Sequence, residues 1–439
     1  MTYGVRDDVT SWGRVVREPQ AVALPQFCDE LPALVAEHPG DSILAAGLHR
    51  SYGDSALNGR GALIDMTRLD RLISFASDTG RLRAEAGVSL DRIIRFAVPR
   101  GFFLPVTPGT RFVSLGGAVA NDVHGKNHHR MGTIGSHVTR LGLLRGNGER
   151  LEIGPHAHAD LFAATVGGLG LTGIIEWAEI TLVPITSSFL DVDTTAFATL
   201  NEFWTLAEAA TDRHEHTVAW IDCARTGWIR GIFSSADWTR DGELAADDDH
   251  PRLRLPVTMP GWLLNGTSVG AFNSIYFHVQ RRGVGRTRKS FAAVFYPLDA
   301  IGHWNRLYGA KGFWQYQCVL PEAAMREGIA ELLNVIARSG QGSFLSVLKT
   351  FGNVPSPGLL SFPMPGATLA LDFRNRGEET MRLFDRLDAI VRAAGGRIYA
   401  AKDGRVSGAL WRAGYPRFEE FSKHIDPHFS SDFWRRVAA

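Results

Sequence analysis

Short apolar runs alternate with glycine-rich turns along the first part of the chain. This pattern predicts β-strands at residues 43–46, 62–66, 82–88, 137–145 and 174–184. Ser89 and Asp160 each precede a run with helical spacing of apolar residues, which predicts two helices. Strand signals outnumber helix signals, so we expect an α+β fold.

The composition of the chain shifts near Thr186, where longer segments with aromatic side chains begin. Residues 323–339 and 379–394 have helical periodicity, and residues 368–373 between them are typical of a strand. Two further segments differ from both patterns. Residues 236–256 carry charges and prolines, which predicts an exposed loop, and residues 257–276 are apolar and glycine-studded, a candidate lid.

These shifts predict two α+β domains in a chain that crosses between them twice. The first would consist of residues 1–185 together with residues 397–439, and the intervening domain would span residues 186–396. A length of 439 residues agrees with two or three domains.

Charge and cysteine content exclude several kinds of partner and site. Lys and Arg number 47 against 46 for Asp and Glu, so no positive field attracts nucleic acid. Three widely spaced cysteines fit neither a disulfide framework nor a zinc site, which favours a reducing compartment. We expect no signal peptide and no spanning helix, and therefore a cytoplasmic protein or one held peripherally at the inner membrane.

Three clusters of small residues stand out as candidate binding loops. Residues 47–54 follow a predicted strand, residues 105–125 contain Pro-Gly and Gly-Gly pairs, and residues 165–174 repeat the theme. Glycines let backbone N–H groups converge on a diphosphate and let a planar ligand lie against bare backbone. The Gly-x-Gly-x-x-Gly at residues 168–173 follows a helical segment and precedes a strand, the reverse of a Rossmann fingerprint.

In matching order, these clusters resemble the FAD-binding domain of the vanillyl-alcohol-oxidase family, the PCMH-type flavoproteins. The strings LHRSYGD, PGTRFVSLGGAVANDVHGKNHH, TVGGLGLTGI, WNRLYGAKGFWQYQ and YAAKDGR extend the likeness over nearly the whole chain, to the branch that oxidises lipid-linked ribose. HGKNHH is the most specific string. The resemblance implies a two-domain α+β fold with an antiparallel sheet in the substrate domain.

The family pattern also implies the residues that contact FAD. They are Gly47, Leu48, His49, Arg50, Ser51, Tyr52, Gly53, Asp54, Ser55, Gly109, Ser114, Leu115, Gly116, Gly117, Asn121, Asp122, Val123, His124, Ile174 and Tyr399. Arg50 occupies the position where many members carry the histidine that bonds to the flavin, so noncovalent binding is expected. His49 replaces a glycine of close relatives, so a covalent link through this neighbouring histidine is the alternative.

The same resemblance places His124, Gln315, Gln317, Lys349 and Lys402 around the reacting face of the flavin. Lys402 or His124 could accept the proton of a substrate hydroxyl, and a cationic Lys402 would favour reduced flavin. Gln315 and Gln317, two apart on an extended segment, present both amides to one side and suit sugar hydroxyls.

Several residues of this set have simpler interpretations or depart from the pattern. Lone lysines are usually solvated, and histidines such as His124, His128 and His129 pack more often than they bind metal, so no metal is expected. Phe295 stands at a substrate position where a tyrosine is expected. Ala370 replaces a cysteine that nitroaromatic inhibitors capture in mycobacterial relatives, so such inhibitors should lose their covalent anchor.

The resemblance implies oxidation of the 2'-hydroxyl of a polyprenylphosphoryl-β-D-ribose to the 2'-keto sugar. An NAD-dependent partner reductase would then complete epimerisation to the arabinose donor of a cell-wall polysaccharide, with a peripheral membrane contact for the lipid tail. One alternative is an alditol or aldonolactone oxidase that acts on a soluble sugar and uses oxygen. A second is a noncatalytic flavin-binding carrier.

Overall fold

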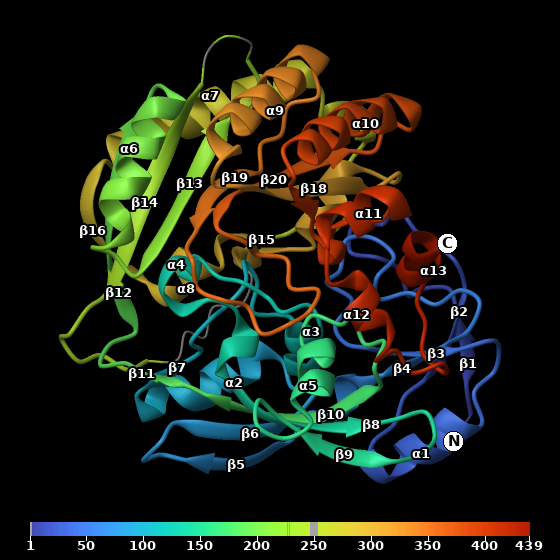
Figure 1. The fold of residues 1–439 in the computed structure, drawn as a ribbon. Coiled ribbons are helices and arrows are strands. Elements are labelled where there is room, and N and C mark those ends of the chain that lie inside the picture. The colour runs from blue at the N-terminus through green and yellow to red at the C-terminus, as the bar shows by residue number, and fades with distance from the viewer. Residues whose placement is uncertain (1, 226, 228, 246–252) are drawn as a thin grey trace.

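The first part of the chain forms two sheets with short helices between them (Figure 1). The computed structural model describes residues 2–225, 227, 229–245 and 253–439. One sheet, in the order β1-β2-β4-β3, consists of β1 (Gly4–Arg6), β2 (Gln20–Ala23), β4 (Ala62–Asp65) and β3 (Ile43–Ala46). The other, in the order β5-β6-β10-β8-β9, consists of β5 (Leu72–Ala76), β6 (Arg81–Glu85), β10 (Ile174–Thr181), β8 (Val138–Leu144) and β9 (Arg150–Ile153). A small pair joins β7 (Phe102–Phe103) to β11 (Val183–Pro184).

Local sequence explains where the helices of this part begin. They are α1 (Leu31–Ala36), α2 (Leu90–Ala97), α3 (Leu115–Ala120), α4 (His128–Met131) and α5 (Ala159–Thr165). Ser89 caps α2 by accepting a hydrogen bond from the backbone N–H of Arg92, as its sequence predicts. Ile93 and Ile94 then turn into the core shared with the five-stranded sheet. The predicted strands are confirmed, except that residues 174–184 divide into β10 and β11.

An eight-stranded antiparallel sheet forms the other half of the molecule (Figure 1). In sheet order it consists of β16 (Gly285–Ser290), β12 (Phe189–Phe197), β14 (Arg230–Trp238), β13 (His216–Asp222), β19 (Ser346–Phe351), β20 (Gly366–Arg374), β18 (Phe313–Pro321) and β21 (Arg397–Ile398). Helices α6 (Leu200–Thr211), α9 (Met325–Ser339) and α10 (Glu378–Ala393) share one core with it. The two fold halves confirm the predicted α+β class with an antiparallel sheet.

The two faces of this sheet differ because side chains alternate along each strand. On β20, Leu369 and Leu371 enter the core under α9 and α10. Their neighbours Ala370 and Asp372 face a cavity on the opposite side. The sheet therefore has a helix-covered face and a cavity face.

The segment predicted as a lid contains a helix that its sequence does not reveal. Helix α7 (Gly266–Arg282) carries apolar residues on both its buried and its exposed faces, which removes the usual period. β15 (Leu253–Arg254) precedes it and pairs with β17 (Ile301–Gly302), and α8 (Phe291–Phe295) follows. Of the predicted loop at 236–256, the first residues end β14, and residues 246–252 lie outside the described part.

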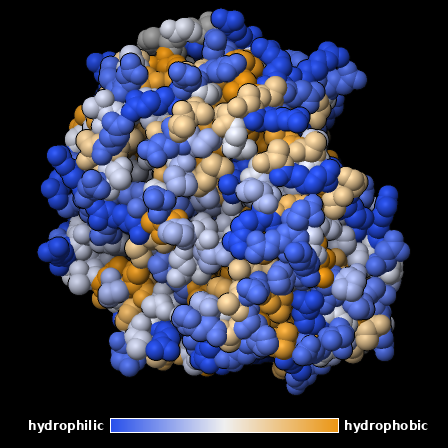
Figure 2. Space-filling view, viewed as in Figure 1, coloured by the Kyte–Doolittle hydropathy of each residue, from blue (hydrophilic) through white to orange (hydrophobic). Residues whose placement is uncertain are grey.

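The C-terminal chain returns to the first sheet. It leaves the eight-stranded sheet after β21 and forms α11 (Gly408–Gly414), α12 (Phe418–Ser422) and α13 (Asp432–Ala438). Phe429 bridges Ile43 of β3, and both termini lie on the same side of the molecule (Figure 1). The viewed face is mostly hydrophilic (Figure 2). Among the described helices, none combines the length and apolar character that crossing a bilayer requires.

Arg436 of α13 holds the C-terminal segment in place by pairing with two buried carboxylates. Its guanidinium lies 2.7 Å from Asp54 and 3.0 Å from Asp403. We expect Arg436→Met to lower the free energy of unfolding by about 3 kcal/mol, because removal of one partner leaves buried charge unpaired. The measurement is the thermal unfolding midpoint of the holoprotein.

The matched control is Arg382→Met, which breaks the exposed pair between Arg382 and Glu378 on α10. Exposed pairs contribute little, so this variant should unfold at the wild-type temperature. Equal effects of the two substitutions would contradict a fastening role for Arg436.

Candidate functional site

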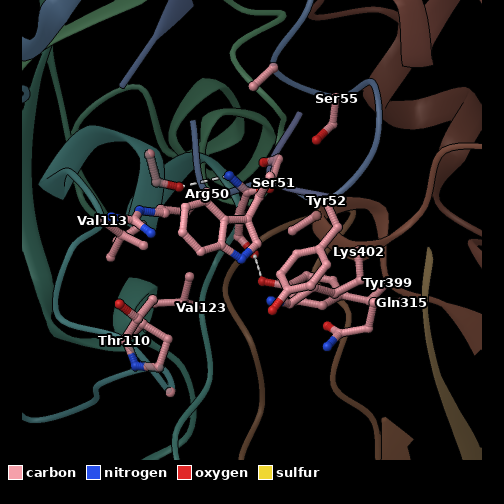
Figure 3. Close-up of a pocket in the computed structure, with 18 of the residues that line it drawn as sticks. Arg50, Ser51, Tyr52, Ser55, Thr110, Val113, Val123, Gln315, Tyr399 and Lys402 are labelled. Carbon is pink, nitrogen blue, oxygen red and sulfur yellow. Dashed lines mark hydrogen bonds between the residues drawn. The ribbon is translucent and has the colours of Figure 1, made fainter. Parts of the chain in front are cut away.

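A cavity of about 310 Å³ lies between the loops of the first part and the cavity face of the eight-stranded sheet. This size falls within the range of roughly 300–1,000 Å³ that is typical of small-molecule sites. Figure 3 shows Lys402, Tyr399 and Gln315 close to Tyr52 on one side, with Thr110, Val113 and Val123 on the other. Segments far apart in the sequence therefore form one pocket.

The loop after β3 forms the first wall, at residues 47–55. A side chain at Gly47 would place its Cβ 2.0 Å from Ser114 Oγ, so only glycine lets this loop approach α3. His49 has a φ of 49°, in the left-handed region that favours glycine. The guanidinium of Arg50 lies 4.0 Å from the ring centre of Trp12. This wall therefore consists of glycine-rich backbone and of the Arg50 guanidinium stacked on the Trp12 ring.

The start of α3 forms the second wall. Ser114 caps the helix by accepting a hydrogen bond from the backbone N–H of Gly117 at 3.3 Å. The Asn121 amide donates to the Gly117 carbonyl, while its Oδ1 is buried with no hydrogen-bond partner in the described chain. A buried acceptor of this kind is costly unless a ligand or water satisfies it.

The cavity face of the sheet provides the third wall, which carries most of the polar groups. Gln315 and Gln317 of β18, Lys349 of β19 and Asp372 of β20 line it, with Lys402 following β21. The side chain of Gln315 donates to Asp372 Oδ1, and the Tyr308 hydroxyl donates to Oδ2 at 3.4 Å.

The enclosed position of these groups shifts their pKa values. Burial lowers the pKa of Lys402 below its usual 10.5, although the charge of Asp372 acts in the opposite direction. Burial raises the pKa of the Asp372 carboxyl from 3.8. Burial and two neighbouring lysines lower the pKa of Lys349 to about 7. The Lys402 ammonium lies 3.9 Å from the ring centre of Tyr52.

His124 occupies an apolar position beside Gln317. Its ring contacts Phe351 and Tyr399, at centroid distances of 4.9 and 5.3 Å, and its Nε2 lies 3.2 Å from Gln317 Nε2. Burial keeps the pKa of His124 well below 6.5, so the imidazole is neutral near pH 7. Within the described residues, no group of His, Cys, Asp or Glu has the arrangement of a metal site.

The structure brings most of the expected site residues to this cavity. Those that line it are Gly47, Leu48, His49, Arg50, Ser51, Tyr52, Ser55, Gly109, Ser114, Gly117, Asn121, Val123, His124, Gln315, Gln317, Lys349, Tyr399 and Lys402. Ala370 also lines it.

Seven expected residues support the walls instead of lining them. They are Gly53, Asp54, Leu115, Gly116, Asp122, Ile174 and Phe295. The Asp122 carboxylate accepts hydrogen bonds from the backbone of Gly135 and the hydroxyl of Ser361, which shapes the turn after α3. Phe295 packs among aromatic rings, 4.8 Å from His216 and 5.8 Å from Trp238. It does not line the cavity.

Sequence reasoning missed two acidic residues of the cavity. Asp372 lies two positions after Ala370 on a predicted strand, so strand alternation was a signal that could have found it. Asp299 accepts hydrogen bonds from the Thr110 hydroxyl at 2.7 Å and the Arg111 backbone at 2.9 Å. It sits in a 3-10 turn at Pro297–Ala300 that is too short to show periodicity, so no local pattern marks it.

A profile of the FAD binding domain matches residues 19–154. The match covers the first two walls, and the structure fits such a ligand. Buried polar atoms of His49, Arg50, Ser55 and Asn121 have no partner in the described chain and border the cavity. Glycine leaves the backbone beside them open to a large planar group. The chain therefore contains an FAD-binding domain, and these walls have features that would suit the cofactor.

We expect Asn121→Leu to weaken FAD binding by about tenfold, because one hydrogen bond to a buried acceptor contributes roughly 1.5 kcal/mol. The side chains have similar volume, so the fold should persist. The measurement is the dissociation constant of FAD, from fluorescence titration of the flavin-free protein.

Asn201→Leu is the control, because Asn201 is exposed on α6, away from the cavity. It should leave FAD affinity unchanged. Wild-type affinity in the Asn121 variant would show that this acceptor does not meet the cofactor.

Several known proteins are similar to this chain. Decaprenylphosphoryl-beta-D-ribose oxidase of Mycolicibacterium smegmatis is 37% identical over 97% of this chain and 96% of its own length. L-gulono-1,4-lactone dehydrogenase of Mycobacterium tuberculosis is 22% identical over 98% of both chains. D-arabinono-1,4-lactone oxidase of Yarrowia lipolytica is 25% identical over 45% of this chain and 39% of its own. The chain belongs to the family of decaprenylphosphoryl-beta-D-ribose oxidase, whose members are FAD-binding oxidoreductases.

Proposed function

We propose that this protein oxidises the 2'-hydroxyl of a polyprenylphosphoryl-β-D-ribose to the 2'-keto sugar. One observation carries the proposal: a single cavity joins the glycine-bare FAD walls to a wall of Gln315, Gln317, Lys349 and Lys402. The near full-length similarity to the oxidase of a lipid-linked ribose supports this substrate. The aldonolactone enzymes are more distant.

The two parts of the chain would bind different ligands. Residues 1–185 with residues 397–439 would hold the cofactor, and residues 186–396 would bind the sugar. Bound FAD accepts the two electrons that leave the alcohol carbon. The residues beside Gly47 and Ser114 would hold it without a covalent bond, because Arg50 stands where other members of the family carry the bonding histidine; attachment through the adjacent His49 is the alternative.

Lys402 would take the hydroxyl proton. Its amine is enclosed in the cavity, and burial moves its pKa toward neutrality, as a general base requires. His124, neutral and beside Gln317, is the second candidate acceptor. The amides of Gln315 and Gln317 project from the same face of β18 and would bind the sugar hydroxyls.

The product and the lipid carrier imply two further partners. A 2'-keto sugar becomes the epimeric alcohol when a reductase adds hydride, so we propose that an NAD-dependent enzyme consumes it. That product would be the arabinose donor for a cell-wall polysaccharide. The prenyl tail requires access to a membrane, so we propose peripheral action at the cytoplasmic face of the inner membrane.

Lys402→Met should slow reduction of the bound flavin by substrate at least roughly a hundredfold, while FAD stays bound. In the wild type, the rate should rise with pH through an apparent pKa below 10.5, because only the neutral amine accepts a proton. Asp372, Lys349, His124 and Tyr52 face or border this amine and will contribute to the apparent value. Stopped-flow absorbance near the flavin band measures the reduction rate of the variant and the pH dependence of the wild-type rate.

Lys423→Met serves as the control, since Lys423 is exposed beside α12. It should keep the wild-type rate and pH profile. If substrate reduced the flavin of Lys402→Met at the wild-type rate, Lys402 would not be the proton acceptor. That result would favour a noncatalytic flavin carrier or another base.

A short-chain farnesylphosphoryl-ribose should reduce the flavin, whereas free ribose and L-gulono-1,4-lactone at equal concentration should not. The reason is that the proposed site binds a phosphorylated, lipid-linked sugar. Anaerobic flavin bleaching measures reduction, and hydrogen peroxide release measures use of oxygen. Faster reduction by the lactone would establish the soluble-sugar alternative.

A further inference from the structure

Helix α7 has an inner face that is fixed to the sheet and an outer face that is apolar. Inside, the Asn273 amide donates to Asp222 Oδ1 at 2.9 Å and to the Ser343 carbonyl at 3.1 Å. Outside, Phe272, Ile275 and Val279 are 47%, 66% and 55% exposed. Their spacing of three and four residues aligns them in one stripe. The helix thus presents an ordered apolar stripe to the surroundings.

The segments before and after α7 also carry exposed apolar residues. Leu253 and Val257 precede α7, Trp262 lies just before it and is 71% exposed, and Val284 follows it. We call these residues, with the outer stripe of α7, the α7 surface. Single exposed apolar residues are ordinary, but a group on one continuous segment marks an interaction site.

The charged residues within the segment that carries the α7 surface have one sign. From Leu253 to Leu298 the sequence contains no Asp or Glu, and it contains six basic residues: Arg254, Arg281, Arg282, Arg286, Arg288 and Lys289. Two of them pair with acids of other segments, Arg286 with Asp191 and Arg288 with Asp241. Arg254, Arg281 and Arg282 are exposed. Helix α10, by contrast, mixes both charges on its exposed face.

The α7 surface lies on the cavity side of the eight-stranded sheet. On β13, Ala219 and Ile221 enter the core under α6, whereas Trp220 points to the other face and meets Tyr276 of α7 at 4.8 Å. Figure 1 places α7 at the end of the molecule far from β5 and β9.

A chain of ring contacts joins α7 to the cavity wall. Phe272 contacts Phe344 at 5.5 Å, and Phe344 contacts Tyr308 at 5.4 Å. Tyr308 in turn lies 6.3 Å from Trp304, which lines the cavity. The helix is therefore connected to the cavity wall through these rings, although none of its own residues lines the cavity.

We propose that the α7 surface docks the protein on an anionic lipid bilayer, with Trp262, Ile275 and Val279 in the interface. Apolar side chains flanked by exposed Arg match a negatively charged lipid surface. The inference deepens the proposed function, because a polyprenyl-phosphate substrate resides in such a bilayer. Docking on this side would bring the cavity close to the lipid headgroups.

The test is sedimentation of the holoprotein with vesicles of phosphatidylglycerol and phosphatidylcholine. The wild type should bind anionic vesicles and lose binding in phosphatidylcholine alone or at high salt. Ile275→Ser with Val279→Ser should reduce the partition coefficient at least roughly tenfold. Arg281→Gln with Arg282→Gln should reduce it by about tenfold or more on anionic vesicles.

Controls come from exposed residues elsewhere. Ile73→Ser on β5, and Arg382→Gln with Arg386→Gln on α10, should bind vesicles like the wild type. Flavin content and unfolding temperature verify that each variant folds. All variants should reduce their flavin normally with soluble farnesylphosphoryl-ribose, and the α7 variants should lose turnover of a long-chain substrate held in vesicles.

Different failures separate the two proposals. Vesicle binding without oxidation of either ribose substrate would leave docking intact and overturn the proposed function. Oxidation of the short substrate without vesicle binding, or wild-type binding by the α7 variants, would overturn docking. A dimer that the Ile275 and Val279 substitutions dissociate, with no vesicle binding, would assign the surface to a second copy and also overturn it.

Discussion

The close contact between the loop after β3 and the chain after β21 sets the geometry of the whole site. The Tyr52 backbone donates to the Ala401 carbonyl at 2.9 Å, which holds the two segments together. A side chain at Gly53 would bring its Cβ 1.8 Å from the Asp403 carbonyl oxygen. Only glycine permits this approach, and it brings Lys402 over the ring of Tyr52. The cofactor walls and the substrate wall are thereby fixed to each other.

The same contact makes the chemistry depend on desolvation. A lysine in water would remain charged, but the enclosure beside Tyr52 lowers the pKa of Lys402 and raises that of Asp372. The attraction between the two charged forms opposes both shifts, because ionisation of either group favours ionisation of its neighbour. Among the described residues, no carboxylate opposes in this way the lowering of the pKa values of Lys349 and His124. Asp372 thus limits how far burial lowers the pKa of Lys402.

Local sequence predicts most of this architecture. The features that it does not predict depend on contacts between residues far apart in the chain. Glycines and a cap such as Ser114 mark backbone conformations that few other residues adopt, so the cofactor loops were predictable. Whether a glycine faces the cavity or the protein depends on distant contacts: in α3, Gly116 packs against Ala86, and its neighbour Gly117 lines the cavity. Helix α7 was hidden because both of its faces are apolar, and Phe295 sits within an aromatic cluster that no periodicity reveals.

The apolar outer face of α7 and the polar cavity would suit two different parts of the proposed substrate. A lipid-linked sugar has a head that hydrogen bonds well and a tail that water excludes, so one pocket cannot satisfy both ends. Here Gln315 and Gln317 supply polar contacts deep in the cavity, while Trp262 and Ile275 remain outside on the adjoining surface. An enzyme of free lactones would gain nothing from that exposed surface and would bear its tendency to aggregate. The arrangement therefore favours a substrate whose tail stays in the bilayer while its head reaches the flavin.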